Sequence, residues 1–258
     1  MNGLFDTHAH LNDEKFDEDR ESVILSLKEN GISYVVIPSD TFKSSLKTVE
    51  IVGKYDFLYG AVGVHPHEVK DTSDEELEKL KEIAGTNDKI VAIGEIGLDY
   101  YYDFSPRELQ KEILIKQLNT AKDLKLPVII HSRDAMGDTY DILSKFKGEV
   151  VGVMHCYSGS FDMAKRFIDL GYYISLGGPV TFKNAKTPKE VAKNVDLKRL
   201  LIETDSPYLA PEPVRGKRNE PKNVNYVAEM IASLREMTKE EIVDITRKNA
   251  LKLFNIEV

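Results

Sequence analysis

The chain has 258 residues, 41% hydrophobic and 30% charged, with a formal net charge of −8 at pH 7. This is the balance of an ordinary globular domain. The acidic surface argues against non-specific binding of nucleic acid by the whole molecule, although it is compatible with a local basic rim. No apolar run is long enough to predict a membrane span, the N-terminus lacks a secretory pattern, and the single cysteine, Cys156, excludes an intramolecular disulfide framework. We therefore expect a cytoplasmic protein with neither a membrane partner nor an obligate protein partner.

Taken in chain order, eight apolar and β-branched runs predict strands, with amphipathic helical segments between them. Runs such as PVIIH and VVGVMHC do not alternate in polarity, which is typical of strands buried on both faces of a parallel sheet. The predicted strands are Leu4–His10, Tyr34–Ser39, Leu58–His65, Ile90–Leu98, Pro127–His131, Val151–Cys156, Tyr172–Leu176 and Leu200–Asp205.

Eight alternating units fit a single α/β domain over residues 1–258, a (β/α)8 TIM-type barrel. The competing doubly wound sheet would place a glycine-rich phosphate loop after the first strand, whereas the stretch THAHLND, at the end of this strand and just beyond it, contains no glycine. The segment from Asn223 to Phe254 predicts two extra C-terminal helices, the second with a capping-box pattern at Thr238-Lys239-Glu240-Glu241.

All six histidines lie at or just past the end of a predicted strand, where the active site of a barrel forms. A lone histidine there is more often a satisfied core residue, but six together favour convergence on one rim. Two carboxylates, Glu95 and Asp205, also end apolar strands, which is costly for a charge unless it is paired or metal-bound. The histidines are His8, His10, His65, His67, His131 and His155.

Four of these histidines and the two carboxylates are too many ligands for one tetrahedral zinc. They suit two divalent ions that share a bridging carboxylate, at a separation of roughly 3.5–4 Å. We assign Glu95 to the bridge. The first predicted site contains His8, His10 and Asp205, and the second contains His131 and His155.

Six motifs occur in order: DTHAHL, GVHPH, GEIGLDYYYDFSPRELQKE, HSRDA, HCYSG and ETDSPYLAPEPVRGKRNEP. Together they closely resemble the TatD family of metal-dependent deoxyribonucleases, in the amidohydrolase-like barrel superfamily, from Asp6 to about Phe254. The resemblance implies a TIM-type barrel, a divalent metal centre and hydrolysis of ester bonds, best known as magnesium-dependent cleavage of DNA. It implies the same six ligands. Glu95 stands where many superfamily relatives carry a carboxylated lysine, which favours this family over dihydroorotase- or phosphotriesterase-like enzymes.

For catalysis, we expect Asp205 to orient or deprotonate the attacking water and Glu95 to help hold it. His67 is a candidate phosphate contact or proton donor, or else a loop histidine without a role. His65 is expected to be structural. Cys156 is expected to be a buried apolar residue.

For substrate binding, Arg133 is a candidate phosphate contact, with an ion pair as the alternative. The segment after the eighth strand and residues near Lys183 predict a locally basic rim suited to a phosphate-bearing substrate, unless these charges are merely solvated. Tyr100, Tyr101 and Tyr102 could stack on exposed bases or pack under the loop. The basic residues of that last segment are Arg215, Lys217, Arg218 and Lys222, and Lys186 accompanies Lys183.

The leading hypothesis is a deoxyribonuclease, a 3′-5′ exonuclease-type phosphodiesterase that uses a water activated by two metals. The alternative is amidohydrolase-type cleavage of an amide or carboxylic ester, such as an aminoacyl-tRNA ester. A non-catalytic metal-binding protein is the third possibility. Mg, Mn, Zn and Ni all remain open as the metal, although histidine ligands suit the last three better.

Overall fold

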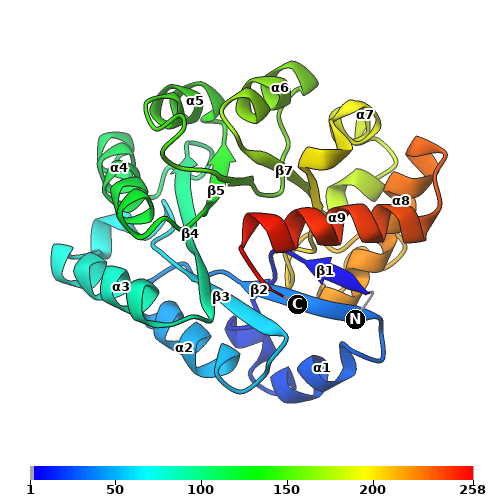
Figure 1. Cartoon of the computed structure of the whole chain (residues 1–258), viewed down its shortest axis with the longest axis horizontal. Coiled ribbons are helices and arrows are strands. Elements are labelled where there is room, and N and C mark those ends of the chain that lie inside the picture. The colour runs from blue at the N-terminus through cyan, green and yellow to red at the C-terminus, as the bar shows by residue number, and fades with distance from the viewer. Residues whose placement is uncertain (1–2, 258) are drawn as a thin grey trace.

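The computed structural model describes residues 3–257. Its strands form one parallel eight-stranded sheet that curls into a nearly closed barrel (Figure 1). Each strand pairs with the next one in the chain, and this confirms the predicted α/β barrel. The strands are β1 (Leu4–Asp6), β2 (Ile32–Ile37), β3 (Leu58–Val62), β4 (Ile90–Asp99), β5 (Val128–Arg133), β6 (Gly152–Met154), β7 (Tyr173–Leu176) and β8 (Leu200–Ile202).

A helix follows every strand, and the helices surround the sheet (Figure 1). The predicted C-terminal pair is present, but the first of the two is the helix of the eighth unit, so only the last one is additional. The helices are α1 (Arg20–Ser26), α2 (Phe42–Val52), α3 (Asp74–Thr86), α4 (Arg107–Leu124), α5 (Met136–Ser144), α6 (Phe161–Asp169), α7 (Lys186–Asn194), α8 (Val224–Arg235) and α9 (Lys239–Leu253).

The additional helix α9 crosses the barrel beside β1 and β8 (Figure 1). It begins at a capping box, in which Thr238 Oγ1 accepts the Glu241 N–H at 3.2 Å and Glu241 Oε2 accepts the Thr238 N–H at 2.8 Å. At its other end the ring of Phe254 lies 6.1 Å from that of Phe5 in β1. The helix thus packs on the two strands that would otherwise form the barrel's seam. Among residues 3–257, no helix combines the length and apolar composition that crossing a membrane requires.

Several strands end earlier than the sequence predicts. β1 stops at Asp6, β6 at Met154 and β8 at Ile202, because regular pairing ceases where the chain turns onto the rim. The predicted strand Leu4–His10 is therefore too long, and His8 and His10 lie beyond the regular sheet. Asp6 joins the first and last units, since its carboxylate accepts the Thr204 N–H at 2.9 Å and the Thr204 hydroxyl at 2.6 Å.

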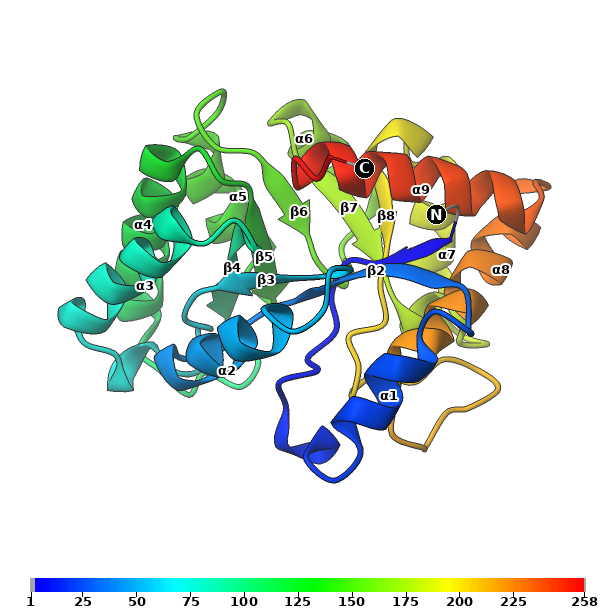
Figure 2. The ribbon, with the colours of Figure 1, turned by 60° about the horizontal axis from the view of Figure 1, so that its bottom comes forward.

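Beyond the strands, the segments that follow β1 and β8 run side by side (Figure 2). The His10 N–H donates to the Ser206 carbonyl at 2.7 Å, and the Asp205 N–H donates to the His8 carbonyl at 2.9 Å. These bonds hold the two segments in register after the regular sheet has ended, and they bring polar residues from both ends of the chain to one rim.

Candidate metal centre

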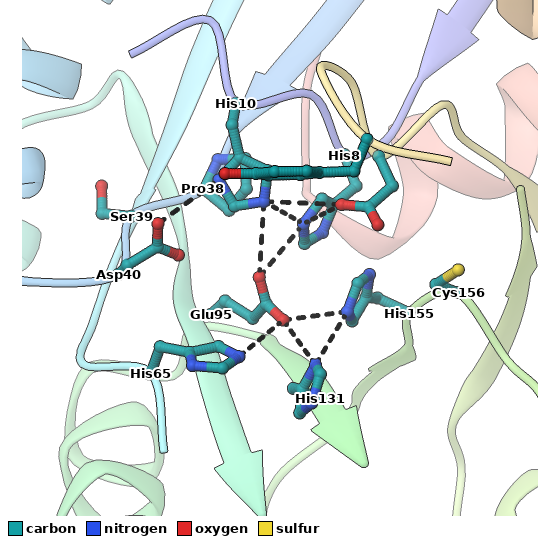
Figure 3. Close-up of polar contacts among 12 residues, drawn as sticks. His8, His10, Pro38, Ser39, Asp40, His65, Glu95, His131, His155 and Cys156 are labelled. Atoms are coloured by element: carbon teal, nitrogen blue, oxygen red, sulfur yellow. Dashed lines mark hydrogen bonds and ion pairs between the residues drawn. The ribbon is translucent and has the colours of Figure 1, made fainter. Parts of the chain in front are cut away.

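Glu95 lies at the middle of a cluster of histidines, with its two carboxylate oxygens directed to different groups (Figure 3). It is 3% exposed, on β4. Oε2 lies 3.2 Å from His8 Nε2, whereas Oε1 lies 2.9 Å from both His131 Nδ1 and His155 Nε2. One buried carboxylate thus faces two separate sets of ring nitrogens.

The first set comes from the segments after β1 and β8. His8 Nε2 and His10 Nε2 are 3.0 Å apart, and Asp205 Oδ1 lies 3.7 Å from the former and 3.5 Å from the latter. Burial lowers the pKa of His8, so its ring is held in the neutral form that can ligate a metal. The predicted first site is therefore brought together around Glu95 Oε2.

The second set comes from β5 and from the residue that follows β6. His131 Nδ1 and His155 Nε2 lie 3.3 Å apart. His65, for which we expected a structural role, also faces this set, with Nε2 at 3.5 Å from Glu95 Oε1. Burial holds the pKa of His65 well below its usual value, which leaves the ring neutral. Its Nδ1 accepts the His67 N–H at 3.2 Å, so Nε2 carries the proton that faces Glu95.

The donor atoms of these residues fit divalent cations. Three groups of residues each offer one ring nitrogen or carboxylate oxygen per residue, and within each group these ligand atoms lie within 4.8 Å of one another. The groups are His8, His10 and Glu95; His8, His155 and Asp205; and His65, Glu95 and His131. The Nε2 atoms of His8 and His10 lie 3.0 Å apart beside the buried carboxylate of Glu95. A bound cation stabilises such an arrangement of two imidazole nitrogens and a carboxylate. Within residues 3–257, the buried Nδ1 of His8 has no hydrogen-bond partner.

A second layer of carboxylates holds the outer nitrogens of the second set. Asp99 Oδ2 lies 2.9 Å from His131 Nε2, and Glu203 Oε1 lies 3.2 Å from His155 Nδ1. Glu203 also accepts the Cys156 N–H at 2.5 Å. Although burial opposes it, the hydrogen bond with His131 keeps the pKa of Asp99 below its ordinary value. Such outer carboxylates fix the tautomer and orientation of metal-binding histidines.

No role was predicted from the sequence for Asp99, Glu203 or Asp40. Asp40 follows β2, and its Oδ2 lies 3.7 Å from His10 Nδ1. Burial raises the pKa of Asp40 to about 6. Burial acts in the opposite direction on His10, but nearby carboxylates, Asp40 above all, raise its pKa to about 9. The available signal was position, since all three carboxylates follow apolar runs.

His67 lies beside the second set. Its Nε2 is 3.0 Å from Asp99 Oδ2, although the pair lacks hydrogen-bond geometry. Its ring lies against Tyr102 and Phe104, with centroids 5.3 and 4.9 Å away. Cys156 is partly buried, and its sulfur points away from Glu95 (Figure 3). Burial raises the pKa of this thiol, and Cys156 belongs to none of the candidate ligand groups among the described residues.

A cavity of about 840 Å³ opens above the cluster. Both metal-facing sets contribute to its lining, and so do Arg133, Tyr102, Phe104 and Tyr208. Arg133 is the one arginine or lysine among the described lining residues, and its guanidinium lies 3.8 Å from the ring centroid of Tyr101. The cavity therefore has a polar floor, an aromatic wall and a single permanent cation.

The other basic residues predicted to contact the substrate do not line this cavity. Arg218 makes two hydrogen bonds to Asp19, at 2.8 and 2.6 Å. Arg215 packs over Phe182 and lies 3.8 Å from Glu212. Lys183, Lys186, Lys217 and Lys222 are also absent from the described lining. The rim segment is rich in cations, but its two arginines face carboxylates.

The three tyrosines after β4 differ in their surroundings. Tyr100 donates its hydroxyl to Asp138 at 2.7 Å and packs against the protein core. Tyr101 and Tyr102 are exposed, and Tyr102 lines the cavity. Tyr100 therefore packs within the protein, as the alternative prediction has it, whereas the exposed rings of Tyr101 and Tyr102 are accessible to a ligand.

Comparisons with known proteins agree with this architecture. A family model described as "TatD related DNase" matches residues 5–255. The chain is 50% identical to the uncharacterized metal-dependent hydrolase YabD of Bacillus subtilis, over 98% of this chain and 99% of that protein. It is 38% identical to the uncharacterized metal-dependent hydrolase YcfH of Escherichia coli K12, over 98% and 96%. The crystal structure of the TatD homologue YjjV from E. coli K12 superposes with a TM-score of 0.94 over the whole of both chains, at 32% identity.

Proposed function

This chain belongs to the TatD family of metal-dependent hydrolases, and we propose that it hydrolyses phosphodiester bonds at the 3′ end of single-stranded DNA. The single observation that carries the proposal is the position of the Glu95 carboxylate at the floor of an open cavity. One of its oxygens faces the first set of histidine nitrogens, and the other oxygen faces the second set. Sites that hold two cations a few ångströms apart recur in nucleases and phosphatases.

In this proposal, Glu95 would be shared by two divalent ions. His8, His10 and Asp205 would hold the first ion, and His131 and His155 would hold the second. When bound, such ions lower the pKa of water and offset the negative charge that develops on a phosphoryl oxygen.

The remaining chemistry falls to protein groups around the centre. Hydrogen bonding with His10 and the neighbouring histidines hold the pKa of Asp205 below its ordinary value against the effect of burial, so this carboxylate is ionised at neutral pH. Asp205 Oδ1 then orients the attacking water and accepts its proton. His67, which lines the cavity beside Asp99, donates to the leaving oxygen. Arg133 pairs with a phosphate oxygen at the mouth.

A second candidate is cleavage of an amide or carboxylic ester. It is favoured by the composition of the cavity, whose lining combines the single arginine Arg133 with several carboxylates and with apolar residues such as Leu176 and Val180. That lining suits a substrate with less negative charge than a polynucleotide, such as an aminoacyl ester.

The deciding experiment uses metal-stripped protein and 5′-labelled single-stranded DNA, with Mg²⁺, Mn²⁺ or Zn²⁺ added in turn. We expect a ladder of shortened products that keep the label, because shortening from the 3′ end leaves the 5′ end intact. The variant Glu95→Ala should abolish the ladder, and Glu50→Ala, which alters an exposed carboxylate on α2 paired with Lys54, should not. If protein carrying two ions by elemental analysis cleaves no DNA but hydrolyses an aminoacyl ester, the second candidate replaces the first.

A further inference from the structure

An aromatic patch lies beside the metal centre without an assigned role. It is formed by Tyr101, Tyr102 and Phe104, in the loop between β4 and α4. These side chains are 57%, 48% and 55% exposed, respectively. The rings of Tyr102 and Phe104 stack on each other, with centroids 5.2 Å apart and planes 27° apart. Large aromatic side chains that gather on the surface next to a cavity commonly mark a binding site.

The loop that carries this patch is fixed to the candidate centre through Asp99. Asp99 Oδ1 accepts the N–H groups of Tyr101 and Tyr102, at 3.0 and 2.9 Å, while Oδ2 faces His131 Nε2. One buried carboxylate therefore holds both a metal-facing histidine and the backbone of the aromatic patch. The backbone that carries the rings is thus held in place relative to the reacting groups before any ligand arrives.

Two further contacts tie down the loop. The buried side chain of Gln110, on α4, accepts the Asp99 N–H at 2.8 Å and donates to the Ser105 carbonyl at 2.8 Å. Ser105 in turn donates its hydroxyl to the His67 carbonyl at 3.0 Å. A platform that is already ordered loses little conformational entropy when a flat ligand binds to it.

The patch is continuous with the floor of the cavity. The ring of His67 contacts both Tyr102 and Phe104 and lies 4.3 Å, between centroids, from that of His65. The guanidinium of Arg133 lies 4.9 Å from the centroid of Tyr102. A ligand that extends from the centre across the patch thus meets rings and one cation, which match the bases and phosphates of a single strand.

We propose that Tyr102 and Phe104 form a stacking subsite for one nucleobase of a single-stranded substrate, with Arg133 on an adjacent phosphate. The inference rests on the proposed function and specifies how that substrate is held. Stacking uses the face of the base, which all four bases share, so the subsite tolerates any sequence. A duplex keeps its bases stacked inside and cannot use it, and preference for single strands follows.

The test combines loop variants with modified oligonucleotides. The double variant Tyr102→Ala/Phe104→Ala should raise KM for a single-stranded oligonucleotide about 10- to 100-fold, with a smaller effect on kcat. The pair Tyr102→Phe/Phe104→Tyr keeps both rings and should behave as wild type. Elemental analysis and thermal melting of every variant establish that metal content and folding are unchanged.

Substrates with a single abasic residue, placed at each of the last four positions in turn, locate the subsite. For the wild type, one position should give a rise in KM similar to that of the double variant, and the double variant should be insensitive to it. Equal KM values for the wild type and the double variant, or no abasic penalty in the wild type, overturn the inference.

A binding measurement that needs no cleavage distinguishes failure of the stacking subsite from failure of the proposed function. Single-stranded DNA with 2-aminopurine at the identified position, or at each terminal position if nothing is cleaved, should lose fluorescence on binding to the wild type but not to the double variant. Quenching without cleavage keeps the subsite and removes the nuclease. If the wild type produces no quenching, the subsite is refuted whatever the enzyme cleaves.

Discussion

The buried carboxylate of Glu95 depends on the orientation of the histidines around it. A buried carboxylate is costly unless charge or hydrogen bonding compensates it, and histidines on both sides lower the pKa of Glu95 well below its usual value despite its burial. The compensation depends on where each ring nitrogen points. That orientation is set in the second layer, where Asp99 and Glu203 hold His131 and His155.

We therefore predict that Asp99→Asn and Glu203→Gln each weaken metal binding about 10- to 100-fold while leaving the fold intact, because outer carboxylates of this kind orient the ligands and raise their basicity. Competition with a chromogenic chelator measures the effect. Asp138→Asn is the matched control, since Asp138 binds Tyr100 and Lys111 but faces none of the histidines. Unchanged affinity in both variants would show that the rings are positioned by packing alone.

At this scale the sequence predicts which residues meet but not all of what they do. The strand-end positions of His8, His10, His131 and His155 suffice to predict that they converge, because strand ends in a barrel share one rim. The orienting bonds of Asp99 and Glu203 depend on side-chain directions that spacing does not encode. Arg218 was expected at the substrate, and its pairing with Asp19, 199 residues away, is equally invisible in the local sequence.

Among the elements, α9 is linked to the site indirectly, through the strands on which it packs. It packs on β1 and β8, the two strands whose following segments supply His8, His10 and Asp205. Its capping box could be predicted from the sequence because the pattern is local. The ends of β1 and β8 could not be predicted, because the apolar runs continue into rim segments that leave the sheet.

We predict that Thr238→Ala lowers the free energy of unfolding by about 1 kcal/mol, because the first turn of α9 loses a side-chain acceptor for the Glu241 N–H. Urea unfolding followed by circular dichroism measures the loss, and Thr238→Ser, which keeps the hydroxyl, is the control. Activity at 25 °C should be unchanged, since the folded state still predominates. A loss of activity without a loss of stability would mean that the helix end acts on the site directly.

For the molecule as a whole, the eightfold alternation of strand and helix was enough to predict the barrel, because each unit must bury an apolar strand under a helix. Electrostatics are harder to predict, since they depend on pairing. The net charge is −8, and the rim segment is rich in lysine and arginine. However, Arg215 and Arg218 face carboxylates in the structure, and Arg133 is the one lysine or arginine in the described lining.

This distribution predicts an unusually weak dependence of DNA binding on salt. Each phosphate neutralised on a single strand contributes a slope of about 0.7 to the plot of log affinity against log salt. With Arg133 as the main contact, we expect a total slope of about 0.7 to 1.4, measured as KM for single-stranded DNA over a range of salt at fixed metal concentration. Arg133→Ala should remove about 0.7 of that slope, and Arg218→Ala should leave it unchanged because its guanidinium is already bound to Asp19. A slope of several units that falls in Arg218→Ala would place the substrate across the rim segment and require its ion pairs to open on binding.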